Sequence, residues 1–353
     1  MIPEITISKS TLYVVIFWSN APISSKNISS KLPATHRGKV AEHTDETFYR
    51  SLYRIRRVEE EIVRLYPSDR IKSPVHLSIG QESVSVGVCS ALSTNDIVFG
   101  TYRGHALYLA KGGDLNSMMA ELYGKRDGSA RGKAGSMHLI DLGAGMMGTS
   151  AIVATTIPHA VGYALAIQMR RENRIVAVFF GDGASDEGVF HESMNFAALK
   201  KLPILFVCEN NGYAIYSPVS DRMPADNFCE RAESYRIPST RVQSGKTTEI
   251  RDAAAHAAVA IRKGNGPQFL ECLTARWRDH VGPDEDRIWN YRPDSELDDW
   301  IARDDVAATA SRIDQARRSA IEAEVEREIA DAIAFAEASP YPAMEELNEH
   351  VFR

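Results

Sequence analysis

The chain has 353 residues, of which 44% are hydrophobic and 25% are charged, and these proportions are typical of a soluble globular protein. Its 41 basic and 47 acidic side chains give a formal net charge of -6, so no basic surface calls for nucleic acid. The four cysteines are scattered and form no CxxC pair, which argues against a zinc site and favours free thiols in a reducing cytoplasm.

The first 44 residues carry no evident targeting or membrane segment. The longest early apolar stretch, residues 12–18, is far too short to cross a bilayer, and neither the basic start nor the small-residue cleavage site of a signal peptide is evident. Residues 1–44 are therefore expected to be a disordered leader or the product of a start codon assigned too far upstream. We expect residues 45–353 to form a single α/β domain with a C-terminal helical segment.

The first expected element is an amphipathic helix that ends near Pro67. Its apolar positions recur at helical spacing, at Phe48, Leu52, Ile55, Ile62 and Leu65. A second apolar segment covers residues 84–92. Residues 127–148 contain six glycines and few large apolar side chains, which indicates a long functional loop rather than a regular element.

The centre of the chain alternates expected strands with expected helices. Apolar strands are expected at residues 174–180, 203–208 and 268–272, with a helix after the first of them and another at 253–263. Apolar strands separated by helices predict a doubly wound parallel sheet with helices on both faces. A long charged helix is expected from residue 313 to 338. Its apolar stripe, which we expect to pack within the chain, consists of Ile321, Val325, Ile329, Ala332 and Ile333.

The strongest functional signal is a pair of polar turns that follow two consecutive expected strands. Gly181-Asp182-Gly183 ends the first strand, and after 26 intervening residues Asn210-Asn211 ends the second. Both turns are expected at the carboxyl edge of the sheet, where α/β folds bind ligands. Asp182 and Asn211 offer the hard oxygen ligands that magnesium prefers, and the glycines let the backbone approach a phosphate. The pattern predicts magnesium with a diphosphate, and the alternative is two unrelated turns.

This spacing resembles the thiamine diphosphate motif, and its surroundings resemble the alpha subunits of pyruvate, branched-chain and acetoin dehydrogenase first components. The resemblance covers residues 48–352. It is carried by HLSIGQE at 76–82, TYRGH at 101–105, GSMH at 135–138, GDGASDEG at 181–188, FAALKKLP at 196–203, CENN at 208–211 and GP at 266–267. The fold that it implies is the diphosphate-binding half of the thiamine diphosphate-binding fold.

The resemblance implies which residues bind the metal ion and the diphosphate. Magnesium would be held by Asp182, Asn211 and the backbone carbonyl of Tyr213. The diphosphate would be held by the side chains of Tyr102 and Arg103 and by the backbone amides of Gly183 and Ala184. The arginine would form charge-assisted hydrogen bonds to this anion.

The resemblance also implies which residues lie near the rings of the cofactor. The backbones of Ala151 and Val153 would touch the aminopyrimidine ring, although the related chains commonly have glycine at the first position. His76 and His280 would be catalytic residues beside the reactive thiazolium carbon, and His280 would also reach the diphosphate. Three other histidines are expected to be surface or structural residues: His105, His138 and His159.

A partner chain is implied because thiamine chemistry needs a carboxylate that protonates the pyrimidine ring. In the related alpha subunits this glutamate comes from a separate beta subunit, and the cofactor lies between the two chains. The resemblance therefore implies an α2β2 tetramer that is inactive without its beta subunit. A small-molecule substrate and a lipoyl acyltransferase are the further partners that it suggests.

One segment departs from the related alpha subunits, which often carry Tyr-Arg-x-x-Gly-His-Ser. This chain has Arg276-Trp-Arg-Asp-His280-Val281 and continues into an acidic run at residues 284–286. Val281 replaces the serine that is phosphorylated in some relatives, so that regulation is not expected. The acidic run is either a solvated turn or a feature that changes the acyl donor or acceptor. Residues 242–248 also depart from the related chains.

Three functions remain open at this point. The first is the alpha subunit of an enzyme that decarboxylates a 2-oxo acid, or cleaves acetoin, and passes the acyl group to a lipoyl carrier. The second is a two-chain carboligase or transketolase-like enzyme that transfers the acyl or two-carbon unit to an aldehyde or ketone. The third is a non-catalytic scaffold subunit, which the intact Asp182, Asn211, Arg103 and His76 argue against.

Overall fold

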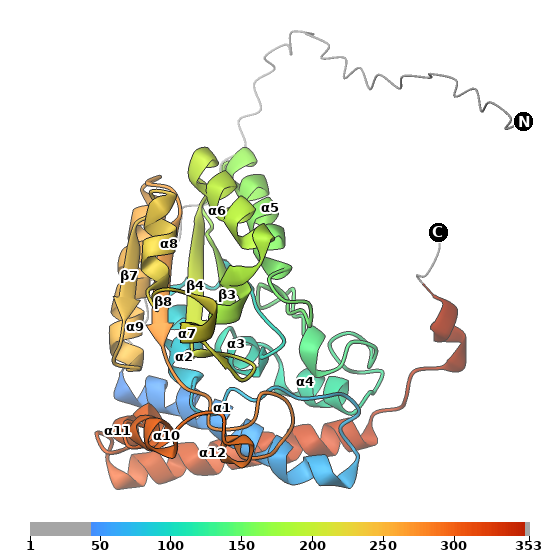
Figure 1. The fold of residues 1–353 in the computed structure, drawn as a ribbon. Coiled ribbons are helices and arrows are strands. Elements are labelled where there is room, and N and C mark those ends of the chain that lie inside the picture. Colours follow the sequence, from blue (N-terminus) through green and yellow to red (C-terminus); the bar gives the residue numbers. More distant parts are fainter. Residues whose placement is uncertain (1–43, 350–353) are drawn as a thin grey trace, which may run out of the picture. The chain divides into compact units, whose positions relative to one another are not determined.

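The computed structural model describes residues 44–349, and their central element is a sheet of six parallel strands (Figure 1). The strand order is β2-β1-β3-β4-β8-β7. These strands are β1 Ile97–Phe99, β2 Met146–Gly148, β3 Val176–Gly181, β4 Ile204–Asn210, β7 Ser239–Val242 and β8 Gln268–Leu273. A separate antiparallel hairpin consists of β5 Tyr213–Ala214 and β6 Ser217–Pro218. The strands expected at residues 174–180, 203–208 and 268–272 are β3, β4 and β8.

Alternate residues of the central strands enter two hydrophobic cores, one on each face of the sheet. In β3, Ala177 and Phe179 belong to one core, whereas Val176, Val178 and Phe180 belong to the other. Successive side chains of a strand point to opposite faces, so a fully buried strand requires cover on both sides. The structure therefore confirms the doubly wound α/β fold.

Helices from distant parts of the chain cover the two faces. The first core takes side chains from α1 Asp45–Leu65, α2 Glu82–Ala91, α3 His105–Ala110, α4 Leu115–Leu122, α9 Thr247–Arg262, α11 Asp305–Ala310 and α12 Gln315–Ala338. The second takes them from α5 Thr156–Met169, α6 Gly188–Lys200, α7 Val219–Arg222 and α8 Phe228–Ser234. The remaining helices are α10 Asp294–Ile301 and the 3-10 turns Tyr66–Ser68, Ser136–His138, Asp182–Asp186, Asp286–Trp289 and Met344–Asn348.

The expected first helix is confirmed as α1, which begins at Asp45. The Thr44 side chain accepts a hydrogen bond from the backbone N–H of Thr47, and this interaction caps the helix. All five apolar positions expected to face the core are buried. A 3-10 turn that contains Pro67 follows the helix directly. The proposed leader at residues 1–44 lies, apart from Thr44, outside the described residues, so the division of the chain into leader and domain stays a prediction.

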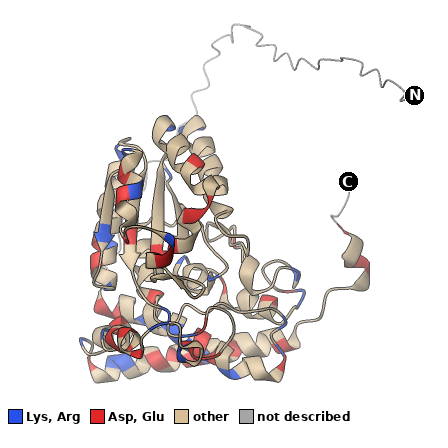
Figure 2. Ribbon diagram, viewed as in Figure 1, with Lys and Arg blue, Asp and Glu red and all other residues tan. Residues whose placement is uncertain are grey.

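The long C-terminal helix α12 packs against α1 and α4. Its buried side chains are Ile321, Val325, Ile329, Ala332 and Ala336, and Ile333 is half-buried against the same core. Figure 2 shows charged residues along both α1 and α12. Ion pairs join the two helices, such as Arg54–Glu328 at 2.6 Å and Arg57–Glu326 at 2.7 Å. The stripe is therefore an intramolecular packing face, as expected, although the helix begins at Gln315 rather than at residue 313.

Two sequence expectations were wrong in detail. The segment 127–148 contains a 3-10 turn and ends in strand β2, whose three residues are too few to show a periodic pattern. The helix expected at residues 253–263 begins earlier, at Thr247. The sequence pattern missed its first turns because most of their residues are polar.

The first part of the segment 127–148 is organised by one buried carboxylate. Glu121 is 1% exposed, and its two oxygens accept hydrogen bonds from four backbone N–H groups, each at 2.8 or 2.9 Å. These donors are Ala130, Gly132, Ala134 and Gly135. The glycine-rich backbone is therefore fixed by hydrogen bonds to a side chain rather than by regular secondary structure.

Among residues 44–349, no helix is both long enough and apolar enough to span a bilayer.

Candidate active site

A cavity lies at the edge of the sheet where β1, β3, β4 and β8 end. Its walls come from the residues that follow these strands, from the start of α2 and from the segment before α5. Of the residues implied by the sequence, those that line the cavity are Tyr102, Arg103, Val153, Asp182, Gly183, Ala184, Asn211, Tyr213 and His280. Ala151 lies between the lining residues Ser150 and Ile152 but does not itself line the cavity.

Asp182 and Asn211 reach the cavity from the neighbouring strands β3 and β4. The Asp182 side chain is 1% exposed and contacts the guanidinium of Arg222. Asn211 donates a hydrogen bond from Nδ2 to Oε1 of Gln81 at 2.9 Å. Its Oδ1 accepts a hydrogen bond from the backbone N–H of Tyr213 at 3.1 Å. These bonds fix the Asn211 amide, so one carboxylate and one amide oxygen are held at the same edge of the sheet.

Arg103 is a buried cation that borders the cavity. It is 8% exposed, and its guanidinium donates hydrogen bonds to the carbonyl oxygens of Leu77 at 2.6 Å and His280 at 3.2 Å. Burial, and next the nearby Arg276, lower the pKa of Arg103. Within residues 44–349 it forms no ion pair with a carboxylate. A buried guanidinium without a carboxylate partner favours an anion in the cavity beside it.

His76 does not itself line the cavity, but its ring packs against Tyr102 and His280, which do. The His76 ring centroid is 4.5 Å from that of Tyr102 and 5.2 Å from that of His280. Burial, and next the charge of Arg103, lower the pKa of His76 to about 3 and that of His280 to about 4. Both imidazoles are therefore neutral near pH 7. The Nδ1 atom of His76 is buried and has no hydrogen-bond partner within the described residues.

Two backbone features shape the cavity beside Asp182. A Cβ added at Gly183 would lie 2.7 Å from the Cβ of Ala214, so this turn has no room for a larger residue. Ile215 has a φ of 56°, which a β-branched residue rarely adopts. Arg276 donates a hydrogen bond to the Ile215 carbonyl at 2.5 Å. A strained residue is thus held at the cavity by a buried arginine.

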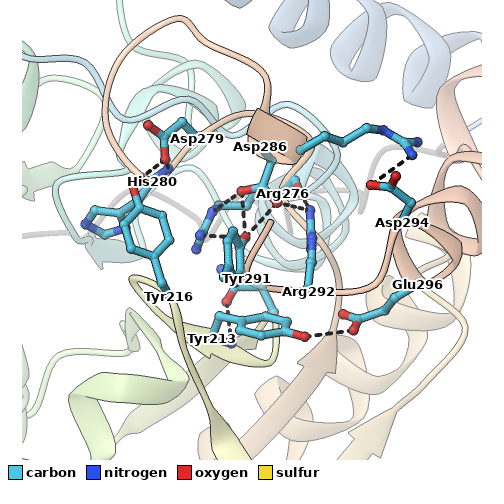
Figure 3. A network of polar contacts seen from close by, with 12 residues as sticks. Tyr213, Tyr216, Arg276, Asp279, His280, Asp286, Tyr291, Arg292, Asp294 and Glu296 are labelled. Atoms are coloured by element: carbon cyan, nitrogen blue, oxygen red, sulfur yellow. Dashed lines mark hydrogen bonds and ion pairs between the residues drawn. The ribbon is translucent and has the colours of Figure 1, made fainter. Parts of the chain in front are cut away.

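Asp286 is the centre of a buried network below the loop that carries His280 (Figure 3). Its carboxylate is 1% exposed and lies 3.3 Å from Nε of Arg276 and 2.7 Å from Nη2 of Arg292. It also accepts a hydrogen bond from the Tyr291 hydroxyl at 2.6 Å. The interpretation of the acidic run as a solvated turn is therefore wrong for Asp286, although the other two acids are exposed. Asp286 is buried because two arginines converge on its carboxylate. Arg276 precedes the acidic run and lines the cavity, and Arg292 follows the run.

The same loop is attached to its neighbours on two sides. Asp279 accepts hydrogen bonds from the backbone N–H of His280 at 2.5 Å and from the Tyr216 hydroxyl at 2.7 Å (Figure 3). Two backbone hydrogen bonds join the loop to the segment that carries His76, from Trp277 N–H to the Ile79 carbonyl at 2.9 Å and from Gly282 N–H to the Val75 carbonyl at 2.8 Å. The position of His280 therefore depends on contacts from several elements.

A second chain of polar groups has the geometry of a catalytic triad but no access to substrate. His105 lies 2.7 Å from the Ser136 hydroxyl through Nε2 and 3.2 Å from Glu59 through Nδ1. All three residues are 0% exposed. Glu59 also accepts a hydrogen bond from the backbone N–H of Ser78 at 2.8 Å. This network of side chains joins the turn at Ser136 to α3 and α1. His105 is structural, as expected.

Four functional candidates were missed in the sequence: Gln81, Glu209, Arg222 and Arg276. Gln81 and Glu209 stand inside two of the motifs that carry the resemblance, so their position in those motifs was an available signal. Glu209 lines the cavity, and burial raises its pKa to about 7 against the opposing effect of Arg103. Arg276 opens the departing loop, but nothing in the sequence marks it as buried. Arg222 carried no signal, because its contact with Asp182 depends on the folding of α7.

Comparison with known proteins assigns the class of this fold and site. Residues 50–345 match the family described as Dehydrogenase E1 component, and the chain therefore belongs to that family. It is 36% identical over 309 residues to the alpha subunit of acetoin:2,6-dichlorophenolindophenol oxidoreductase from Bacillus subtilis, with 86% of this chain and 92% of that protein covered. It is 34% identical over 337 residues to the pyruvate dehydrogenase E1 component subunit alpha of Porphyra purpurea, with 91% and 97% covered. These similarities confirm the resemblance to 2-oxo acid dehydrogenase alpha subunits.

The similarity extends to a mammalian relative. The somatic, mitochondrial form of the pyruvate dehydrogenase E1 alpha subunit of Bos taurus is 32% identical over 314 residues, which cover 86% of this chain and 78% of that protein.

Proposed function

We propose that the chain is the alpha subunit of a thiamine diphosphate- and magnesium-dependent enzyme. This enzyme decarboxylates a 2-oxo acid or cleaves acetoin, and it passes the acyl group to a lipoyl carrier. Family membership supports the proposal, as do relatives named for pyruvate dehydrogenase and acetoin oxidoreductase. The observation that carries it is the buried cation Arg103, which forms no ion pair with a carboxylate of residues 44–349, in a cavity that Asp182 and Asn211 also line.

The residues of the cavity fit a magnesium diphosphate. The Asp182 carboxylate, the Asn211 amide oxygen and the Tyr213 carbonyl are hard oxygen ligands, and magnesium uses few protein ligands together with phosphate oxygens and water. Arg103 and Tyr102 would bind the diphosphate, whose negative charge compensates the buried guanidinium. The backbone amides of Gly183 and Ala184, at the turn with no room for a side chain, would complete the anion site.

The chain's own residues position and polarise the reactants. When bound, thiamine diphosphate would supply a carbon nucleophile and an electron sink for cleavage of the C–C bond beside the substrate carbonyl. The neutral His76 and His280 can each donate a hydrogen bond to the carbonyl oxygen of the substrate, and each can hold a proton at a ring nitrogen. The backbones of Ala151 and Val153 would touch the aminopyrimidine ring.

The open side of the cavity supports a requirement for a beta subunit. Ile152 and Val153 both line the cavity, and they are 67% and 43% exposed. Exposed apolar side chains at a cavity mouth are typical of a surface that another chain covers. We therefore propose that a beta subunit closes the site and supplies the activating glutamate, in an α2β2 assembly. A lipoyl acyltransferase would be the further partner.

The reducing cytoplasm is the compartment that we propose for the chain. All four cysteines are free thiols, and Cys208, Cys229 and Cys272 are buried. Thiols that remain unpaired fit a reducing environment.

The proposal is tested by dye reduction with the purified two-subunit complex. With thiamine diphosphate, Mg2+ and 2,6-dichlorophenolindophenol as electron acceptor, the complex should reduce the dye with one 2-oxo acid or with acetoin. The alpha chain alone should not, and Arg103→Gln should lower the rate by about a hundredfold or more. The proposal is wrong if the cofactor-loaded complex reduces no dye but joins acyl units to aldehydes, which is the carboligase. A complex that cannot be loaded with thiamine diphosphate and Mg2+ would instead favour a non-catalytic scaffold subunit.

A further inference from the structure

The turn that follows β3 carries a cluster of ion pairs in which Asp186, Arg222 and Arg231 have no role in the proposed mechanism. Asp182 and Asp186 begin and end this 3-10 turn, and both carboxylates contact the guanidinium of Arg222. Arg231 donates from Nη1 to the Ser185 carbonyl oxygen at 2.7 Å and lies 3.2 Å from the Asp186 carboxylate. Two arginines thus balance two carboxylates at the edge of the cavity.

Arg222 is held against Asp182 by the local fold. It is the last residue of α7, whose start is fixed by a hydrogen bond from Val219 N–H to the Gly212 carbonyl at 2.9 Å. The Arg222 side chain is only 14% exposed, and Nη1 and Nη2 each contact a different carboxylate. Its Nε is buried without a hydrogen-bond partner within the described residues. The contact is therefore a built feature rather than a solvent-exposed pairing.

We propose that Arg222 is a positioning residue that serves as the counter-cation of Asp182 in the metal-free chain and competes with the divalent metal for this carboxylate. The inference rests on the proposed function, because it takes Asp182 as a metal ligand. A carboxylate that is 1% exposed requires a positive partner, and Arg222 supplies it before the metal arrives.

Metal binding is then an exchange of cations at one carboxylate. A metal ion on Asp182 either displaces the guanidinium onto Asp186 alone or remains beside a like charge. Both arrangements make binding less favourable than it would be next to an uncharged side chain. Arg222 therefore holds the carboxylate in place at the expense of metal affinity, which links the metal site to the segment that carries α7.

The test is a metal titration of the full-length chain purified with its partner subunit and stripped of metal by a chelator. Thiamine diphosphate is held at one fixed excess, and bound Mn2+ is measured from the loss of the free-ion paramagnetic resonance signal. Arg222→Gln should lower the Mn2+ concentration at half-saturation by about tenfold, because the competing charge is removed. Arg222→Lys keeps the charge and should remain closer to the wild-type protein than to Arg222→Gln.

Arg231→Gln is the matched control, since Arg231 belongs to the same cluster but does not contact Asp182. Its half-saturation should change less than that of Arg222→Gln. Circular dichroism and thermal unfolding establish that each variant is folded, and Arg222→Met, which keeps the apolar stem, carries the same expectation if the glutamine variant does not fold. Unchanged or weaker Mn2+ binding in a folded Arg222 variant without charge would overturn the inference. Wild-type protein that binds neither Mn2+ nor thiamine diphosphate would instead contradict the proposed function.

Discussion

Replacement of Asp286 by asparagine removes the carboxylate on which Arg276 and Arg292 converge. Asp286 and Arg276 are each 1% exposed, and Arg292 is 7% exposed, so water cannot take the place of the lost charge. Removal of one partner from a buried ion pair costs about 3–5 kcal/mol, because the remaining charge stays buried without compensation. We therefore expect Asp286→Asn to lower the free energy of unfolding by about this amount.

The assay is equilibrium unfolding in urea, and Asp284→Asn is the matched control. Asp284 lies in the same acidic run but is exposed, and surface substitutions of this kind change the free energy of unfolding by about 0.5 kcal/mol or less. Faster proteolysis of the loop that carries His280 should accompany the loss in Asp286→Asn, because this network lies at the base of that loop. If Asp286→Asn costs no more than Asp284→Asn, the network does not anchor the loop.

Three further predictions concern other parts of the molecule. Glu121→Gln should lower the free energy of unfolding by about 1–3 kcal/mol, because an amide has one acceptor oxygen for the backbone donors that share two carboxylate oxygens in the wild type. Amide hydrogen exchange at residues 130–135 should also become faster. Burial lowers the pKa of His76 from 6.5 to about 3, so the unfolded chain binds a proton at this imidazole more tightly than the folded chain does. The contribution of His76 to the free energy of unfolding is therefore full above pH 6.5 and is lost as the pH falls towards 3. Between about pH 7 and pH 5, the free energy of unfolding in urea should therefore fall by about 2 kcal/mol less in His76→Asn than in the wild type. An equal fall in both proteins would show that this histidine does not titrate as described. Gly183→Ala should weaken thiamine diphosphate binding by about tenfold in a titration, because its Cβ meets Ala214, whereas Gly188→Ala, which meets nothing within 4 Å, should not.

The parts of the fold that could be predicted from the sequence are those that bury continuous apolar segments. Strands β3, β4 and β8 are central and place buried apolar side chains on both faces, so their composition marks them. Strands β1 and β2 have three residues each, and their pairing depends on neighbours that are distant in the sequence. Helix α9 was expected too short, because its first turns are fixed by tertiary contacts rather than by an apolar stripe.

The candidate site divides in the same way. Asp182 and Asn211 were predictable together because each follows a buried strand, and parallel strands end at one edge of the sheet. The partners of these residues were not predictable, since Arg222 reaches Asp182 only through the fold of the hairpin and α7. The burial of Asp286 likewise depends on the convergence of two arginines, which no local pattern in the acidic run reveals.

The central claim is that Asp182 helps to hold magnesium and thiamine diphosphate in this cavity. Native mass spectrometry of the complex purified from its own cells tests it most directly, with the bound small molecules identified. We expect the wild-type chain to carry a second subunit, thiamine diphosphate and a magnesium ion, and Asp182→Ala to keep the subunit but lose both ligands. An intact wild-type assembly that binds no thiamine diphosphate even after reloading, or an Asp182→Ala assembly that retains both ligands, would contradict the account.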